Sequence, residues 1–391
     1  MIGGGQAGLA AGYYLARERR EFVILDAGQR TGDVWRRRWD SLRLFTPACF
    51  THLPGMPFPA RGGYLPSKDE MADYLAMYAA RFDLPIQLGT RVDELVREGD
   101  RYVIAAGQQR LEAGQVIVAT GANASSRVPT FADQLDPTVF QLHSAEYRNP
   151  GQLRAGAVLV VGAGNSGAEI ALELGSRHRT WLAGRDIGHV PITLGCLAYR
   201  LMSSFTVDTW AGRTLAAKRL SAGDLVARVR PNDLIEAGVQ RVGRVVNVSR
   251  GQPMIEGQQI PDVENVVWCT GFVRDYRWIK LPVFDTNGDP MHCRGVVQSE
   301  PGLYFVGLPL QSSVLSDLVG GVGDAAKYIV KRIATRASRG RGPRRDSSLL
   351  SGQSPEPPPR APPEPVVRIH EPQHSNARLH AAIAQQRIRE Q

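Results

Sequence analysis

Short apolar runs, each closed by a glycine or a polar turn, recur along most of the chain and are typical of strands buried in a parallel sheet. Such strands are predicted at residues 22–25, 115–121, 157–161, 265–271 and 302–307. Helices are predicted at residues 9–16, 168–174 and 320–332, and a hairpin at residues 101–106 and 110–113. Because strands and helices alternate, the pattern predicts an α/β fold.

Two glycine loops of the form Gly-x-Gly-x-x-Gly stand directly before two of the predicted helices. The first holds Gly3, Gly5 and Gly8, with Gln6 and Ala7 inside it; the second holds Gly162, Gly164 and Gly167, with Asn165 and Ser166 inside it. Glycines of this motif let the backbone approach a pyrophosphate, while the amides and dipole of the helix start hold its charge. Two bound dinucleotides are therefore expected.

The residues that close the next strand differ between the two loops. Asp26 closes the strand at 22–25, where a carboxylate can bond a ribose hydroxyl, and this suits the adenosine half of FAD. The strand after the second loop ends instead in Gly184 and Arg185. An arginine there favours the 2′-phosphate of NADPH by roughly 1.5–3 kcal/mol. The alternative of an ordinary surface arginine stays open.

A Thr-Gly turn ends a buried strand well beyond each glycine loop, as Thr120-Gly121 and as Thr270-Gly271. This repeated order predicts two nested Rossmann-type dinucleotide-binding domains, the second inserted into the first. The predicted parts are an FAD-binding part at residues 1–150, an NADPH-binding domain at 151–271, a return to the FAD domain at 272–334 and a disordered tail at 335–391.

Length and composition limit the class of protein. The chain has 391 residues, of which 43% are hydrophobic, so it can bury the cores of two or three domains. It holds neither a membrane-spanning run of about 18 apolar residues nor a secretory signal, so we expect a cytoplasmic protein. Cys49, Cys196, Cys269 and Cys293 form no Cys-x-x-Cys pair. We therefore expect no metal or dithiol centre, and interpret each cysteine as a small buried or indifferent side chain.

Much of the net charge of +9 lies at the end of the chain, since residues 335–391 contain ten arginines and five acidic residues. The rest is only mildly basic and lacks the clustered charge and interleaved aromatics of a nucleic-acid-binding protein. The tail is too polar and too rich in proline to pack a core, so it is predicted to be disordered. A weak helix at 376–390 is either a partner-binding segment or part of an unselected extension.

Further motifs accompany the two glycine loops. They are Gly-Asp-Val-Trp-Arg at 32–36, Trp-Asp-Ser-Leu-Arg-Leu at 39–44, Pro-Phe-Pro at 57–59, Ala-Thr-Gly at 119–121, and His143-Ser144 with Tyr147. Together, from residue 2 to about residue 332, they resemble the flavin-containing monooxygenase superfamily, and most closely its bacterial CzcO-like and plant YUCCA-like branch. The resemblance implies FAD in the first domain, NADPH in the second, and a peroxyflavin that oxygenates a small organic substrate with dioxygen.

The resemblance also implies site residues. The first glycine loop, Asp26 and the pair Val34-Trp35 are expected to contact FAD, and the second loop is expected to hold the nicotinamide nucleotide. Thr120 and Gly121 are included among the expected cofactor-binding residues. We assign no catalytic side chain and no metal ligand, because in such enzymes the cofactor carries the chemistry.

Several positions depart from the pattern of the superfamily. Pro137 and Val139 replace a Phe-x-Gly lead-in before His143, and the segment 44–50 lacks the asparagine that animal members place near the flavin. His143 and Tyr147 are therefore expected at a helix start or in the core. Leu308 follows Gly307 where disulfide reductases carry an aspartate, so chemistry like that of thioredoxin reductase is not expected.

Two apolar segments are candidates to roof the flavin and line a substrate pocket, namely 44–64, with Phe45, Phe50, Met56 and Phe58, and 188–210. The alternative is that they fill the core between the domains. Their character favours a small, partly apolar organic acid, amine or ketone. Two functional classes stay open: an oxygenating enzyme, or an NADPH-consuming flavoprotein that acts as a redox or regulatory partner without a dedicated substrate.

The first strand of the FAD domain is short. Only Met1 and Ile2 precede Gly3, whereas residues 157–161 precede the second glycine loop. Losing three or four buried strand residues costs on the order of 5–10 kcal/mol, which is comparable with the stability of a whole domain. We therefore expect the native protein to begin upstream of Met1; the alternative is a truncated gene product.

Overall fold

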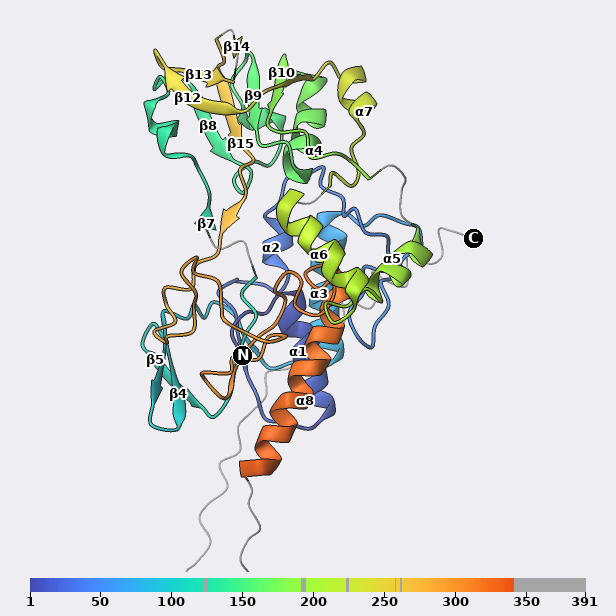
Figure 1. Cartoon of the computed structure of the whole chain (residues 1–391), viewed down its shortest axis with the longest axis vertical. Coiled ribbons are helices and arrows are strands. Elements are labelled where there is room, and N and C mark those ends of the chain that lie inside the picture. Colours follow the sequence, from blue (N-terminus) through green and yellow to red (C-terminus); the bar gives the residue numbers. More distant parts are fainter. Residues whose placement is uncertain (122–124, 191–194, 223–224, 257, 261, 341–391) are drawn as a thin grey trace, which may run out of the picture. The chain divides into compact units, whose positions relative to one another are not determined.

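The computed structural model of the protein describes residues 1–121, 125–190, 195–222, 225–256, 258–260 and 262–340. These residues belong to one compact unit, Met1–Gly342. The segment 341–391, which contains most of the predicted tail and the predicted helix at 376–390, lies outside the described residues (Figure 1).

The first sheet is parallel and is built around a single residue. Strand β1 (Ile24–Leu25) pairs with β2 (Ile86–Gln87), and β6 (Val116–Val118) pairs with β17 (Leu303–Phe305). Ile2 bridges Leu25 on one side and Val118 on the other, and its N–H donates to the carbonyl of Ile117 at 2.8 Å. The central strand, expected to be nearly absent, is thus reduced to Ile2.

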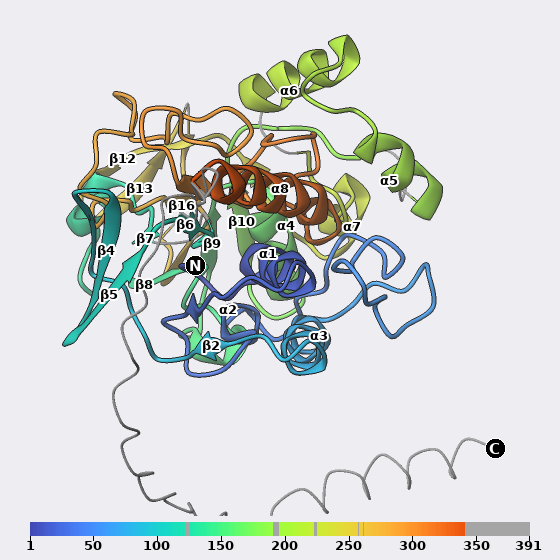
Figure 2. The ribbon, with the colours of Figure 1, turned by 90° about the horizontal axis from the view of Figure 1, so that it is seen from below.

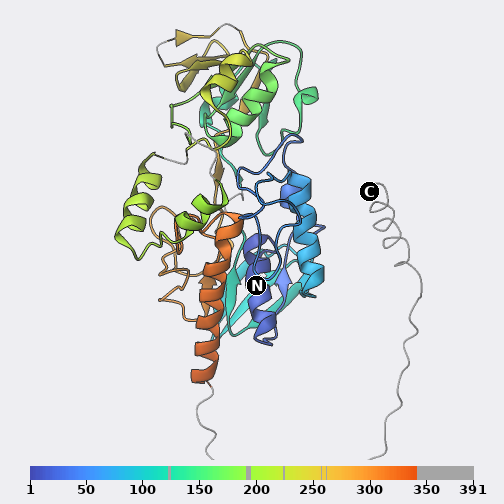
Figure 3. The same ribbon diagram turned by 90° about the vertical axis from the view of Figure 1, so that its right-hand side faces the viewer.

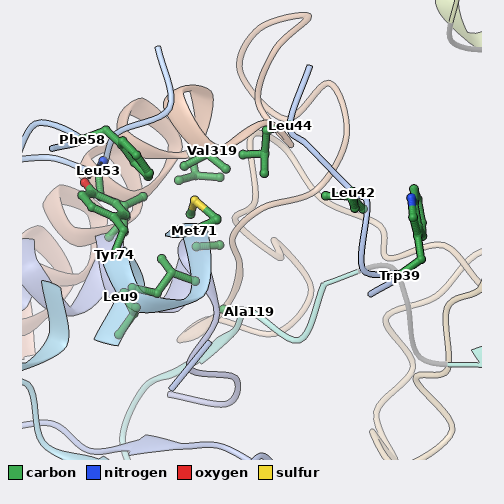
Figure 4. Close-up of a cluster of buried hydrophobic side chains, with 14 of the residues drawn as sticks. Leu9, Trp39, Leu42, Leu44, Leu53, Phe58, Met71, Tyr74, Ala119 and Val319 are labelled. Carbon is green, nitrogen blue, oxygen red and sulfur yellow. Dashed lines mark hydrogen bonds between the residues drawn. The ribbon is translucent and has the colours of Figure 1, made fainter. Parts of the chain in front are cut away.

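Helix α1 (Gln6–Arg17) packs between α3 (Lys68–Arg81) and α8 (Val322–Gly340), as Figures 2 and 3 show. The buried face of α1 is apolar, and Leu9 is fully buried. Leu44, Val319 and Met71 lie in the same core cluster as Leu9 (Figure 4). Helix α8 continues to Gly340, so residues 335–340, which the sequence assigned to a disordered tail, are helical. The buried apolar face of α8 ends at Ile333, and the helix continues from it through the polar residues that follow.

An antiparallel sheet covers one face of the first sheet. Its strands are β3 (Glu94–Glu98), β4 (Arg101–Ala106) and β5 (Gln109–Ala113), and the last two form the predicted hairpin. Leu95, Tyr102 and Ile104 share a core with Val118 and Phe305. The short helix α2 (Asp33–Arg36) lies between β1 and α3 in the chain.

The second sheet is five-stranded and parallel, in the order β11-β10-β9-β15-β8. Its strands are β8 (Phe140–His143), β9 (Val158–Val161), β10 (Thr180–Ala183), β11 (Gln240–Val242) and β15 (Asn265–Trp268). Every residue of β9, β10 and β15 is buried, as expected for strands covered on both faces. Helices α4 (Asn165–Gly175) and α7 (Pro231–Glu236) pack on one face.

A small antiparallel sheet covers the other face, with Trp181 and Trp268 in the core between them. It consists of β12 (Val245–Ser249), β13 (Gln252–Ile255) and β14 (Gln258–Gln259). The remaining helices are α5 (Cys196–Ser203), α6 (Trp210–Ala222) and the 3₁₀ turns Thr130–Gln134, Pro150–Gln152 and Val319–Gly321.

The boundary between the two dinucleotide-binding parts differs from the prediction at residue 150. Strand β8 was placed in the FAD part, but it is the edge strand of the second sheet, paired with β15. The chain crosses between the parts along a two-stranded ribbon, in which β7 (Ser125–Ser126) pairs with β16 (Phe272–Val273). The sequence missed this boundary because β8, Phe-Gln-Leu-His, has only alternate apolar residues.

Candidate active site

A cavity of about 730 Å³ opens where the first sheet meets the start of α1. This volume lies within the usual range of ligand pockets. The structure brings most of the predicted FAD residues together on its wall, namely Gly3, Gly5, Gln6, Ala7, Asp26, Val34, Trp35, Thr120 and Gly121. Gly8 of the same motif does not line the cavity and has a different role.

The first glycine loop is shaped by close contacts of the backbone with itself. A Cβ atom added to Gly8 would lie 2.0 Å from the carbonyl oxygen of Gly3, so α1 can start this close to the strand only with glycine there. Gly3 has a φ of +103°, which favours glycine. A Cβ on Gly5 would meet no atom within 4 Å, because this glycine faces the open cavity. The loop is therefore a cradle that leaves room for a ligand at the start of α1.

The carboxylate of Asp26 braces this loop. Its Oδ2 accepts the backbone N–H of Gly4 at 2.5 Å, and its Oδ1 accepts the N–H of Gly28 at 2.7 Å. Asp26 also lines the cavity. It therefore fixes the geometry of the loop while its carboxylate stays next to a bound ligand.

Asp33 holds several cations at the edge of the cavity. It is largely buried, with 8% of its surface exposed, and it pairs with Arg30 at 3.3 Å, Arg36 at 3.8 Å and Arg37 at 3.9 Å. No role was predicted for these residues from the sequence. The run of arginines at 36–38 is the signal in the sequence that was not used.

The opposite wall comes from the segment between β17 and α8. Leu318, Val319 and Val322 give it an apolar surface at the N-terminal end of α8. Gln6 of α1 donates to the carbonyl oxygen of Asp317 at 3.1 Å, which joins the two walls. A helix start carries partial positive charge, so this end of the cavity suits an electron-rich group.

The loop after β17 is held by one side chain. The Oε1 atom of Gln311 accepts the N–H of Gly307 at 2.9 Å, and its Nε2 donates to the carbonyl oxygen of Phe305 at 2.7 Å. Gly307 and Pro309 thereby take fixed places on the cavity wall. The sequence analysis did not assign this loop to the site.

The two apolar candidate segments divide between the roof and the core. Leu44, Phe45 and Thr46 line the cavity, whereas Phe50 and Phe58 are buried in the core. Within the second segment, residues 191–194 lie outside the described residues, and α5 contacts the loop from outside the cavity. Tyr199 stacks on Phe50 at 5.0 Å and donates from its hydroxyl to the carbonyl oxygen of Phe45 at 3.3 Å.

The second glycine loop repeats the geometry of the first. A Cβ on Gly167 would lie 1.7 Å from the carbonyl oxygen of Gly162, and a Cβ on Gly164 would meet nothing within 4 Å. Arg185 follows the end of β10 and is exposed. The side chain of Asn165 is occupied, because it accepts the N–H of Ala227 at 2.8 Å and donates to the carbonyl oxygen of Leu225 at 3.2 Å. Ser166 lies beside it at the start of α4.

The chain is similar to known oxidoreductases over most of its length. A CzcO-like oxidoreductase of uncharacterized function from Geobacillus kaustophilus is 40% identical, over 85% of this chain and 97% of the relative. A probable indole-3-pyruvate monooxygenase, YUCCA3, from Arabidopsis thaliana is 34% identical over 87% of this chain and 90% of that protein. Residues 1–185 match the family described as pyridine nucleotide-disulphide oxidoreductase.

Among solved structures, a mutant flavin monooxygenase from Stenotrophomonas maltophilia is 28% identical, with a TM-score of 0.72 over 86% of this chain and 97% of that chain. The chain belongs to the flavin-containing monooxygenase superfamily of oxidoreductases. The predicted superfamily, the nested Rossmann-type fold class and the prediction of an enzyme are thus confirmed. None of the helices in the described part of the chain combines the length and the apolar run that crossing a bilayer requires.

His143 and Tyr147, which belong to a motif of the superfamily, are buried in this member. His143 donates from Nε2 to the carbonyl oxygen of Gly271 at 3.0 Å and accepts the N–H of Ala145 at Nδ1, which fixes its tautomer. Burial lowers the pKa of this imidazole. The hydroxyl of Tyr147 donates to Glu173 at 2.8 Å. Both side chains hold loops together, in line with the expected core role.

The interpretation of the cysteines was wrong for one pair. Cys49 and Cys196 form a disulfide across 147 residues, and it ties α5 to the loop that carries Phe45. Cys269 is half-buried, and burial of its thiol raises the pKa of that group to about 12; Cys293 is exposed. The sequence could not reveal the pair, because the two cysteines come together only when α5 folds back over the 44–64 loop.

Arg38 is the cavity residue that sequence reasoning missed most clearly. Its guanidinium carbon lies 5.3 Å from the ring centroid of Phe272, and both residues line the cavity. Burial and the nearby charge of Arg148 lower the pKa of Arg38. Arg38 lies between Trp35 and Trp39, but nothing in the sequence places residue 38 beside residue 272.

Proposed function

We propose that this protein is a monooxygenase that uses FAD and NADPH to oxygenate a small organic substrate with dioxygen. The observation that carries the proposal is the cavity whose wall joins the first glycine loop, Asp26 and the start of α8. This arrangement is supported by the likeness to a flavin monooxygenase over 86% of the chain.

The residues present fit FAD. The first glycine loop leaves open space at Gly5, so the start of α1 can bind a pyrophosphate there, while the Gly4 N–H stays bonded to Asp26. Asp26 accepts a ribose hydroxyl, and the apolar wall of Leu318, Val319 and Val322 suits a flat aromatic ring. Trp35 and Val34 close the cavity along the ligand.

NADPH is the proposed reductant. The second glycine loop has the same open space at Gly164, and the strands of the second sheet end at the edge where dinucleotides bind in such folds. Arg185 is exposed at that edge, next to the place of an adenosine ribose, and supplies the charge that a 2′-phosphate needs.

Bound FAD supplies the transfer of two electrons from NADPH to dioxygen and of one oxygen atom to the substrate. The chain itself binds the cofactors, orients the substrate and excludes water from the cavity. Leu44 and Phe45 close one side of the cavity, and the loop held by Gln311 closes another. We assign no acid or base to this step, since His143 and Tyr147 are committed to structural hydrogen bonds.

The substrate class is a small, partly apolar organic acid, amine or ketone, as the mixed lining of the cavity favours. We place the enzyme in the cytoplasm, where NADPH is supplied.

The test follows whether the electrons of NADPH end in an oxygenated product or in peroxide. The purified protein is loaded with FAD, and NADPH consumption, peroxide release and product mass are followed across a panel of small acids, amines and ketones. The proposal expects slow consumption alone, faster consumption with a particular compound, and a product heavier by one oxygen atom. Peroxide that matches NADPH consumption with every compound contradicts it and supports a redox partner without a dedicated substrate.

A further inference from the structure

Arg38 belongs to the FAD-binding part but lies against the crossing to the other part. It follows α2, and its guanidinium covers the ring of Phe272, in strand β16 of the crossing ribbon. The ring of His143 meets the same phenylalanine edge-on, with centroids 5.1 Å apart. Arg38 therefore stands at the end of the cavity nearest the second sheet.

No carboxylate of the described residues balances the charge of Arg38. Arg30, Arg36 and Arg37 share Asp33, but among the described residues no carboxylate lies within ion-pair distance of Arg38. Arg148 is close enough to repel it, and the Arg148 guanidinium is itself bound to the carbonyl oxygens of Ala145 and Tyr147. A partly buried cation beside a second cation is unfavourable unless an anion joins them.

The register of the second sheet indicates which anion would lie beside Arg38. Strands β10, β9, β15 and β8 end level with one another, because Val161 pairs with Ala183 and Trp268, and Trp268 pairs with His143. The second glycine loop follows β9 at this edge. Arg185 lies on its β10 side, whereas Phe272 and His143, the neighbours of Arg38, lie on its β15 and β8 side.

A dinucleotide on this edge spans the glycine loop. Its adenosine half lies on the side of β10, so its nicotinamide half lies on the side of β15. We propose that Arg38 binds the phosphate of the nicotinamide half of NADPH. This inference rests on the proposed function. It makes Arg38 a positioning residue by which the FAD-binding part fixes the nucleotide held by the other part.

The test compares two ligands on FAD-loaded variants by titration calorimetry. NADP⁺ has both halves of the nucleotide, whereas 2′,5′-ADP lacks the nicotinamide half. We expect Arg38→Gln to weaken NADP⁺ binding at least about tenfold, as for the loss of a charge-assisted phosphate contact. Binding of 2′,5′-ADP and the FAD content stay unchanged. Arg38→Lys keeps the positive charge but lacks the paired N–H donors of the guanidinium, so we expect an intermediate loss of NADP⁺ affinity.

Arg81→Gln is the matched control. Arg81 also covers an aromatic ring, that of Phe82 at 5.9 Å, but it is exposed at the end of α3 and does not line the cavity. We expect it to bind NADP⁺ like the wild type. Unchanged NADP⁺ affinity in Arg38→Gln overturns the inference, and so does an equal loss for both ligands or a loss of FAD. A wild-type protein that holds FAD but binds neither ligand refutes the proposed use of NADPH instead.

Discussion

The carboxylate of Asp26 and the backbone N–H of Gly4 are joined by a hydrogen bond of 2.5 Å. The acid that closes β1 thus holds the glycine loop in place as well as standing next to the ligand cavity. A residue interpreted from the sequence as a ribose ligand is also a support of the loop. Replacing it should therefore affect the bound cofactor in two ways.

Asp26→Ala is expected to weaken FAD binding about tenfold to a hundredfold, since it removes a charged acceptor worth roughly 1.5–3 kcal/mol. The measurement is the dissociation constant of FAD from flavin fluorescence. Asp93→Ala is the control, because Asp93 accepts the N–H of Gly107 at 2.8 Å on an exposed hairpin, outside the cavity wall. Equal weakening in both variants would contradict the role of Asp26.

The two glycine loops give a paired prediction. Gly5→Ala and Gly164→Ala place a methyl group in open space, so the protein should fold normally while losing affinity for FAD and NADP⁺ respectively. Gly8→Ala and Gly167→Ala place it against backbone oxygens at 2.0 and 1.7 Å, so they should also lower the melting temperature. Thermal unfolding and ligand titration of the four variants test this. Normal melting of the last two would show that the loops do not need this close packing.

Arg185→Ala is expected to raise the Michaelis constant for NADPH at least about tenfold and to leave that for NADH nearly unchanged, because only NADPH carries the 2′-phosphate. Steady-state kinetics with both nucleotides measure this. Arg179→Ala removes an exposed arginine just before the other end of β10 and should change neither constant. An equal effect of Arg185→Ala on both nucleotides would contradict the assignment of Arg185 to the 2′-phosphate.

Thiol counting tests the disulfide. Oxidised native protein should show one fast-reacting thiol, that of Cys293, since burial raises the pKa of the half-buried Cys269 thiol to about 12; denaturation should reveal two and added reductant four. Cys196→Ser should lower the unfolding free energy by up to about 5 kcal/mol in the chain-entropy view of a long closed loop. Cys293→Ser is the control and should change it little. Four thiols in the oxidised, denatured protein would exclude the bond.

The α-amino group of Met1 donates to the carbonyl oxygen of Val23 at 2.8 Å, and burial lowers its pKa from 8.0 to about 6. Between these values the unfolded chain binds more protons, so stability rises with pH. The expected gain from pH 6 to pH 8 is about 2 kcal/mol in the unfolding free energy. Urea unfolding of the protein with a free and with an acetylated Met1 isolates this group. The same rise in both forms would assign it to other residues.

Local patterns in the sequence were enough to predict the strands and helices next to the two glycine loops. The apolar strands 157–161 and 265–271 correspond to β9 and β15, and the runs after both glycine loops correspond to α1 and α4. These features follow short-range rules, because burial on both faces demands apolar runs and a tight strand-to-helix turn demands glycine. The same rules predicted that most of the first loop would share one site with Asp26, and the resemblance to the superfamily implied Trp35 as well.

The rest depends on contacts between residues far apart in the chain. The disulfide joins Cys49 to Cys196, β8 joins β15 across more than a hundred residues, and Arg38 meets Phe272 only at the crossing ribbon. No local pattern encodes such pairs, since they are fixed by how the two sheets and α5 pack. The sequence by itself determined the superfamily, the two glycine loops and Asp26, the acid that follows the first loop. Tertiary structure alone decided that, within the described part of the chain, no carboxylate pairs with Arg38, because an ion pair is set by distance in space and not by position in the chain.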